Sequence, residues 1–216
     1  MKSKAMVILL ILSIVLSIVG FTHAYWSETL TITGTVETGE LEVKIYTGMC
    51  KDENGVAVCS WTKIDDHTIR LTISNAYPGC IIKTTWTIRN KGTIPVKLKS
   101  VRIENVRDPD GLYANNLIYV ERIWMWVREH PDKPGHGAYA TPCYLKDMDD
   151  NIYKTLKDYV IHPGGYIYFM CSDTDGDGIP DSPEGDSVWF KFLDGVPENA
   201  TLSFDLVFEW TQYNAP

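Results

Sequence analysis

Basic residues are in short supply in this sequence. Lys and Arg total 20 against 28 Asp and Glu in 216 residues, which gives a formal net charge of −8 at pH 7. Such a chain repels phosphate backbones, so we expect no nucleic-acid partner. Catalytic signatures are missing too: there is no HExxH or GxSxG motif, and the five histidines show no spacing suited to a catalytic zinc. We therefore expect a protein that is not an enzyme.

Tandem repeats and low-complexity linkers are absent as well, whereas apolar residues are plentiful. Hydrophobic residues make up 44% of the chain and aromatic residues 12%, enough to build a sizeable core. This composition excludes a disordered chain and a collagen-like fibre. It predicts one folded domain behind an amino-terminal leader.

The leader, residues 1–24, has the pattern of a secretory signal peptide. Lys2 and Lys4 precede an apolar run from Ala5 to Phe21, and Thr22-His23-Ala24 forms a cleavage site. The run is slightly short for a membrane span, although a leader retained as an anchor is the alternative. Cleavage after Ala24 predicts a secreted protein, extracellular or at the cell surface, with no membrane contact.

Five cysteines fit the oxidising compartment to which such a leader directs a chain. Cys50 and Cys59 flank a stretch rich in turn residues, so a disulfide that closes a hairpin is the first expectation, and Cys143 with Cys171 is the second. Connectivity does not follow from spacing, and the alternative is that several cysteines are small buried thiols. No CxxC spacing indicates a metal site.

The rest of the chain has the two-residue periodicity of half-buried strands. Gly and Pro turns such as Tyr77-Pro78-Gly79 separate the periodic segments, and Asp149–Tyr159 is the one helix candidate. The pattern predicts an all-β protein, a single antiparallel β-sandwich or jelly roll. The expected strands cover residues 30–36, 41–45, 68–74, 83–89, 96–103, 117–127, 166–170, 188–192 and 202–210.

Residues 128–141 are rich in Pro and Gly and predict a long surface loop. In the strand before it, Trp124 and Trp126 share one face and Ile123, Met125 and Val127 the other. We expect the tryptophans to pack in the core or between subunits, with sugar binding as the less favoured alternative.

The strongest chemical motif is an acidic loop between two expected strands. Acids occupy positions 1, 3, 5, 9 and 12 and Gly178 position 6, as in calcium loops of the EF-hand type. Pro180 and Pro183 oppose the exiting helix of an EF-hand, so the loop resembles those of thrombospondin type 3 and dockerin modules. We expect a structural Ca²⁺ ion in an inserted calcium loop, bound by Asp173, Asp175, Asp177, the Ile179 carbonyl, Asp181 and Glu184.

Other polar clusters carry weaker signals. Residues 146–151 form a second acidic cluster without a loop template, which favours surface charge over a metal site. Asp65-Asp66 and the turn at residues 108–111 are explained by the turn propensity of Asp. Asn199-Ala200-Thr201 is a glycosylation sequon, so Asn199 is a possible acceptor.

Several short blocks share the pattern of one family. The leader runs into residues 24–41, Tyr77-Pro78-Gly79 precedes a strand–turn–strand over residues 86–96, a Pro-Gly turn follows at residues 163–165, and the last strand covers residues 204–212. These blocks resemble the TasA/camelysin family of secreted filament proteins. Much of residues 106–160 and the calcium loop have no match in the pattern.

The resemblance implies a jelly-roll subunit of an extracellular filament, pilus or biofilm matrix fibre, as in archaeal bundling pili and calcium-dependent cannulae. In such a head-to-tail homopolymer the amino-terminal strand of one subunit completes the sheet of the next. A protease activity has been described for camelysin, but this chain has no motif to carry it.

Residues 25–38 fit the role of donor strand on their own chemistry. They begin at the cleavage point and alternate apolar with polar residues, and an open sheet edge is stabilised by pairing with such a strand. The alternative is that residues 25–38 fold back and pair with a sheet of their own jelly-roll domain, residues 39–216. The apolar positions of the strand are Tyr25, Trp26, Leu30, Ile32 and Val36.

A second class of function stays open. The aromatic content and the sandwich fold also suit a monomeric, calcium-stabilised cell-surface adhesion or carbohydrate-binding module.

Overall fold

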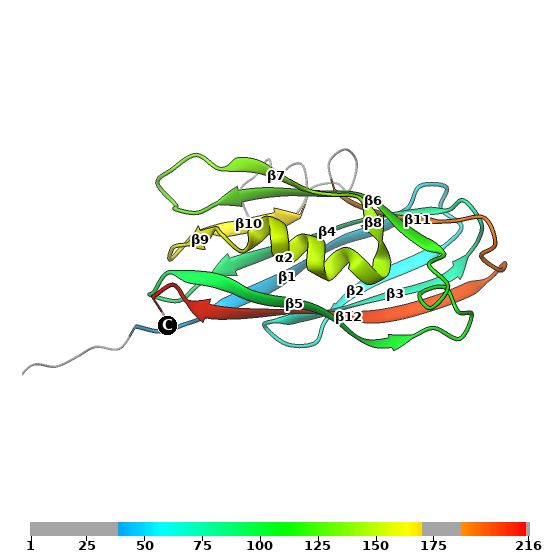
Figure 1. The fold of residues 1–216 in the computed structure, drawn as a ribbon, viewed down its shortest axis with the longest axis horizontal. Coiled ribbons are helices and arrows are strands. Elements are labelled where there is room, and N and C mark those ends of the chain that lie inside the picture. Colours follow the sequence, from blue (N-terminus) through cyan, green and yellow to red (C-terminus); the bar gives the residue numbers. More distant parts are fainter. Residues whose placement is uncertain (1–38, 170–186, 215–216) are drawn as a thin grey trace, which may run out of the picture. The chain divides into compact units, whose positions relative to one another are not determined.

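The computed structural model describes residues 39–169 and 187–214 (Figure 1). Within these residues two antiparallel sheets face each other, which confirms the prediction of an all-β fold of the sandwich type. Sheet A has the order β1 (Val43–Asp52), β4 (Ile81–Asn90), β10 (Tyr166–Phe169), β6 (Ile118–Arg128) and β11 (Val188–Phe192), and β7 (His136–Ala140) and β8 (Cys143–Tyr144) also pair with β6. Sheet B has the order β2 (Val58–Lys63), β3 (Thr68–Ala76), β12 (Ala200–Gln212), β5 (Val96–Arg107) and β9 (Val160–Ile161).

The core lies between the sheets and follows from the alternation of the sequence. Each strand turns every second side chain inward, and the inward residues of both sheets are almost completely buried. Trp86 of β4 stacks on Phe169 of β10, with ring centroids 4.2 Å apart, and meets Trp61 of β2 edge-on at 5.2 Å. These rings fill the space between sheets A and B, where burial of apolar area is the main stabilising contribution.

The connection from β1 to β2 joins sheet A to sheet B. Asp52 is 2% exposed, and its carboxylate accepts hydrogen bonds from the backbone N–H groups of Val56 and Ala57 and from the Tyr77 hydroxyl. Gly55 adopts a φ of 72°, which favours glycine in this tight turn. The Cys50–Cys59 disulfide spans the same connection.

Helix α2 (Met148–Leu156) contacts β5 of sheet B and β7 and β8 of sheet A (Figure 1). The short helix η1 (Leu145–Asp147) leads into it. Met148, Ile152 and Leu156 recur every four residues and are buried, so one stripe of the helix packs against the sheets. The helix candidate of the sequence is thereby confirmed.

Most expected strands are confirmed with small shifts at their ends, whereas three features differ. Strand β2 was not among the expected strands, because its alternation is short: Cys59 and Trp61 are partly buried and the other four residues are exposed. Residues 128–141 are not wholly a loop, because His136–Ala140 forms β7 and pairs with β6. The expectation that Trp124 and Trp126 pack in the core is also wrong, since Ile123, Met125 and Val127 are the inward residues of β6, and packing between subunits stays a prediction.

Candidate functional site

The two sites that the sequence predicts most strongly lie outside the described residues. These are the calcium ligands Asp173, Asp175, Asp177, Ile179, Asp181 and Glu184, and the donor-strand residues Tyr25, Trp26, Leu30, Ile32 and Val36. Both therefore stay predictions. What the structure describes is the part of the sandwich to which the acidic segment, residues 170–186, is attached.

The acidic segment starts and ends in the middle of sheet A. Strands β10 and β11 both lie between β4 and β6 and both run antiparallel to them. Phe169, the last residue of β10, is opposite Trp86, and Val188, the first of β11, is opposite Thr84. One β4 residue, Thr85, separates the two positions. Residues 170–186 are thus inserted into one interrupted central strand.

The first expected disulfide is confirmed, but it does not close a hairpin, because β1 pairs with β4 and β2 pairs with β3 in the other sheet. Cys50 and Cys59 are bonded, with their Cα atoms 5.7 Å apart. Cys143 is buried and has no disulfide partner among the described residues, and Cys171, its expected partner, lies outside them. Cys80 is a buried thiol, and burial raises its pKa to about 11.

Two acidic turns have the structural roles that turn propensity predicts. The Asp108 carboxylate accepts hydrogen bonds from the backbone N–H groups of Leu112, Tyr113 and Ala114, and Asp65 accepts one from His67. In the cluster at residues 146–151, Asp149 accepts a hydrogen bond from the Ile103 N–H at 3.3 Å. The described residues contain no group of three or more His, Cys, Asp or Glu side chains placed to hold a metal ion.

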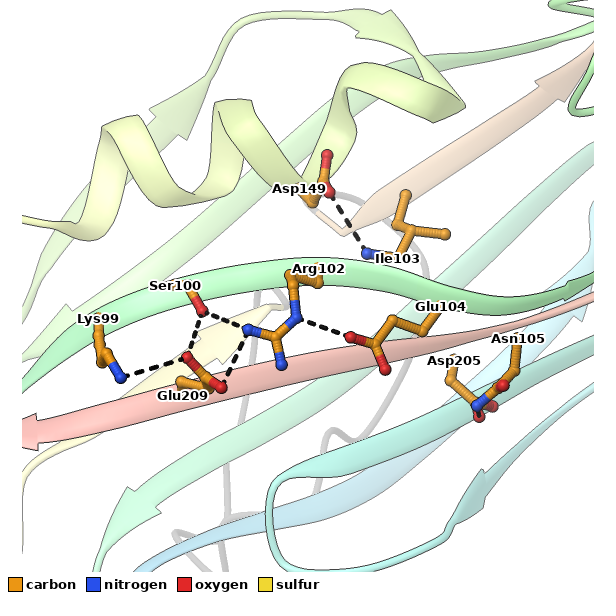
Figure 2. Close-up of polar contacts among 9 residues, drawn as sticks. All are labelled: Lys99, Ser100, Arg102, Ile103, Glu104, Asn105, Asp149, Asp205 and Glu209. Carbon is orange, nitrogen blue, oxygen red and sulfur yellow. Dashed lines mark hydrogen bonds and ion pairs between the residues drawn. The ribbon is translucent and has the colours of Figure 1, made fainter.

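The outer face of sheet B carries a ladder of paired charges (Figure 2). Arg70 of β3 donates two hydrogen bonds to the Asp205 carboxylate of β12, at 2.6 and 2.8 Å, and Asn105 donates a third at 2.7 Å. Further along β5, Arg102 bridges Glu104 at 2.7 Å and Glu209 at 2.9 Å. Each of these cations therefore has a carboxylate partner.

The ion pairs and hydrogen bonds of this ladder lower the pKa of two of its carboxyl groups. The hydrogen bonds from Arg70, opposed by burial and assisted by Asn105, hold the pKa of Asp205 below its usual value. Hydrogen bonds from Ser100 and Arg102 lower the pKa of Glu209 in the same way. Exposed ion pairs of this kind each contribute little to stability unless several of them form a network, as they do here.

The outer face of sheet A is different, because aromatic and basic residues alternate across it. The register aligns Tyr46, Thr87, Tyr168 and Trp126 in one row, on β1, β4, β10 and β6 in turn. The next row holds Lys44, Arg89, Tyr166 and Arg128. Trp126 is 39% exposed and Tyr139 of β7 is 49% exposed.

Cations stack on the aromatic rings of this face. The Arg89 guanidinium lies 5.8–5.9 Å from the ring centroids of Tyr46, Tyr166 and Tyr168. On β11, the Trp189 ring has Lys83 at 4.4 Å and Arg122 at 4.6 Å. The sequence does contain a signal for this face, because Arg122, Trp124, Trp126 and Arg128 recur every second residue and so share one face of β6. Its meaning depends on Tyr46, Arg89 and Tyr166, which only the sheet brings beside them.

Comparison with known proteins leaves the site to be judged on its own geometry. No family model matches the chain, and no curated protein matches it. Among the described residues, no helix is long and apolar enough to cross a membrane.

Proposed function

We propose that this protein is a secreted structural subunit of an extracellular filament. It is a jelly-roll sandwich that polymerises with copies of itself by donating residues 25–38 to the next subunit, and Ca²⁺ bound by the acidic segment stabilises it. The observation that carries the proposal is the attachment of a segment with calcium-loop spacing at the centre of a sheet.

The attachment supports a structural role for the ion. A cation held by Asp173, Asp175, Asp177, Asp181 and Glu184 offsets the repulsion of five carboxylates in twelve residues. Because β10 and β11 are two halves of one interrupted strand, an ordered loop between them favours the register of both halves against β4 and β6. Calcium therefore has a structural role, because it stabilises sheet A. It does not move a helix as calcium does in sensor proteins.

The donor-strand part rests on the sequence of residues 25–38, which lie outside the described residues and alternate apolar with polar positions. A segment with this strand periodicity is suited to extend a sheet of another copy, which yields backbone hydrogen bonds and buries its apolar face.

The test is assembly of the secreted protein with millimolar calcium or with a chelator, followed by negative-stain electron microscopy and light scattering. We expect fibres with calcium only, and no fibres after deletion of residues 25–36 or with Asp175→Asn and Asp177→Asn combined. Asp150→Asn on α2 is the matched control, an exposed acid outside the loop, and is expected to assemble normally.

Each part of the proposal has its own contrary result. Fibres that form equally in chelator would remove calcium from the mechanism, and fibres that survive the deletion would remove the donor strand. A monomer under every condition would favour the alternative, a monomeric adhesion or carbohydrate-binding module.

Glycosylation of Asn199 is a separate prediction. Asn199 is exposed and thus accessible to a glycosylating enzyme, and mass spectrometry of the secreted protein tests that prediction.

A further inference from the structure

A cluster on the outer face of sheet A carries two positive charges that form no ion pair with an acid among the described residues. It consists of Arg89, Tyr166, Arg128 and Trp126, on the three adjacent strands β4, β10 and β6. Neighbouring strands in a sheet lie about 4.8 Å apart, so the Cα atoms of Arg89 and Arg128, with β10 between them, lie about 10 Å apart. Tyr166 occupies the position between the two arginines.

Neither arginine has a carboxylate partner among the described residues. Arg89 donates to the Tyr168 hydroxyl at 2.9 Å, and its Nε is buried without a hydrogen-bond partner. Arg128 donates to the backbone carbonyls of Lys133 and Pro131 and to the Tyr166 hydroxyl. These acceptors are neutral, so the cluster keeps two positive charges.

Several other cations on the two sheets are paired with acids. On sheet B, Arg70 and Arg102 are held by Asp205, Glu104 and Glu209. On sheet A itself, Lys83 is paired with Glu53 and Lys191 with Glu121. Among the described residues, Arg89 and Arg128 differ from these cations because both lie over one aromatic ring, that of Tyr166, and have only neutral hydrogen-bond acceptors.

The aromatic rings hold these guanidinium groups in a fixed position. Tyr166 and Tyr168 are stacked at 4.0 Å, Arg89 lies over both rings and Arg128 lies over Tyr166 at 5.7 Å. A planar guanidinium restrained by stacking loses little entropy when it binds a planar carboxylate. The exposed Trp126 beside it offers the flat apolar surface on which a sugar ring packs.

We propose that this cluster binds an acidic polysaccharide, with Arg89 and Arg128 facing sugar carboxylates and Trp126 packing against a sugar ring. Charge complementarity selects a polyanion, and the exposed aromatic surface favours a carbohydrate. This inference goes beyond the filament proposal and does not depend on polymerisation, because all of its residues belong to one sandwich.

The experiment measures binding of the full secreted chain to oligogalacturonate, a carboxylated oligosaccharide, by isothermal titration calorimetry with calcium held constant. Dextran serves as the neutral comparison. We expect oligogalacturonate binding that weakens with added salt, and no dextran binding. Trp126→Ala and Arg89→Gln should each weaken binding about tenfold.

Matched controls come from the same chain. Tyr213 is an exposed aromatic residue outside the cluster, near the carboxyl terminus, with an exposed fraction of 47%. Arg102 lies on sheet B and is paired with Glu104. We therefore expect Tyr213→Ala and Arg102→Gln to bind oligogalacturonate as the unchanged protein does. Circular dichroism verifies that each variant is folded. Because Arg89 is partly enclosed, Arg128→Gln is a second variant for the charge, also expected to weaken binding.

Three results would overturn the proposal. One is equal binding of dextran and oligogalacturonate, and another is unchanged binding in Trp126→Ala together with Arg128→Gln. The third is an effect of these substitutions on self-association, measured by sedimentation velocity, with glycan binding absent, which would assign the cluster to a contact between copies. Fibre assembly by the same variants is scored separately, so failure of the filament proposal does not affect this test.

Discussion

Phe169 stacks on Trp86 at the point where the described part of β10 ends. Their ring centroids are 4.2 Å apart and the rings are tilted by 17°, and both side chains are fully buried. The residue after Phe169 belongs to the acidic segment. The attachment point of this segment is therefore built into the core and does not lie on a surface hairpin.

This arrangement predicts that Phe169→Ala is strongly destabilising. Removal of the ring leaves a cavity against Trp86, and such changes cost about 3–5 kcal/mol of unfolding free energy. Denaturant titration measures it, with Tyr213→Ala as an exposed aromatic control that should change stability by less than about 0.5 kcal/mol. Equal effects of both variants would show that the stacked pair is not part of a close-packed core.

The disulfide predicts a second stability change. Cys50 and Cys59 are separated by 9 residues, and a cross-link over so short a loop stabilises the folded state by about 2–3 kcal/mol. The double variant Cys50→Ser and Cys59→Ser should lose this amount in a non-reducing denaturant titration. Reductant should bring the unchanged protein down to the level of the variant, and a difference that persists in reductant would contradict the assignment.

Burial of Cys80 predicts an inert thiol. A pKa of about 11 leaves little thiolate at pH 8, and the thiol is fully buried, so iodoacetamide should modify Cys80 only after unfolding. Peptide mass spectrometry of alkylated protein, native and denatured, makes the comparison. Rapid labelling of Cys80 in the native protein would be inconsistent with its place in the core.

The Arg70–Asp205 pair predicts loss of stability in acid. The folded-state pKa of Asp205 is lowered from its usual 3.8, so its contribution is present above that pH and is lost as the pH falls through the lower folded value. Asp205→Asn should therefore be less stable than the unchanged protein at neutral pH, with the difference shrinking below pH 3.8. Thermal unfolding across this range measures the effect.

An exposed acid gives the control for that series. Glu104 pairs with Arg102, but both side chains are more than 40% exposed, so Glu104→Gln should change stability little at any pH. A pH-independent difference for Asp205→Asn would mean that shape, and not charge, explains its effect.

Gly137 predicts a steric effect at the aromatic face. A Cβ atom at this position would lie 2.7 Å from the Trp124 ring, so Gly137→Ala should cost about 1–2 kcal/mol. Combination with Trp124→Ala removes the obstacle, and the double-mutant cycle should show a compensating coupling between the two sites. Strictly additive effects would disprove the contact.

Much of the sandwich could be predicted because strand periodicity is a local property. Residues 188–192 are a strand with the expected bounds, and the helix candidate at residues 149–159 is α2. Strand β2 was missed because its alternation is short, with only Cys59 and Trp61 turned inward and an apolar residue, Val58, turned outward, and its register is set by pairing with β3. Strand β7 was hidden by Gly137 and by the Pro-rich approach to it, and pairing with β6 overrides these local signals.

The sequence by itself determined the acidic composition, the strand alternation, the pairing of Cys50 with Cys59 and the twelve-residue loop of calcium-type spacing, because each depends on residues close together in the chain. Only the tertiary structure decided that this loop interrupts a central strand, and that Trp126 faces outward beside Arg89 and Arg128. Those relationships join β4, β6, β10 and β11, in which paired residues such as Ile81 and Lys191 lie far apart in the sequence, and they follow from sheet register, which the cooperative packing of the core fixes.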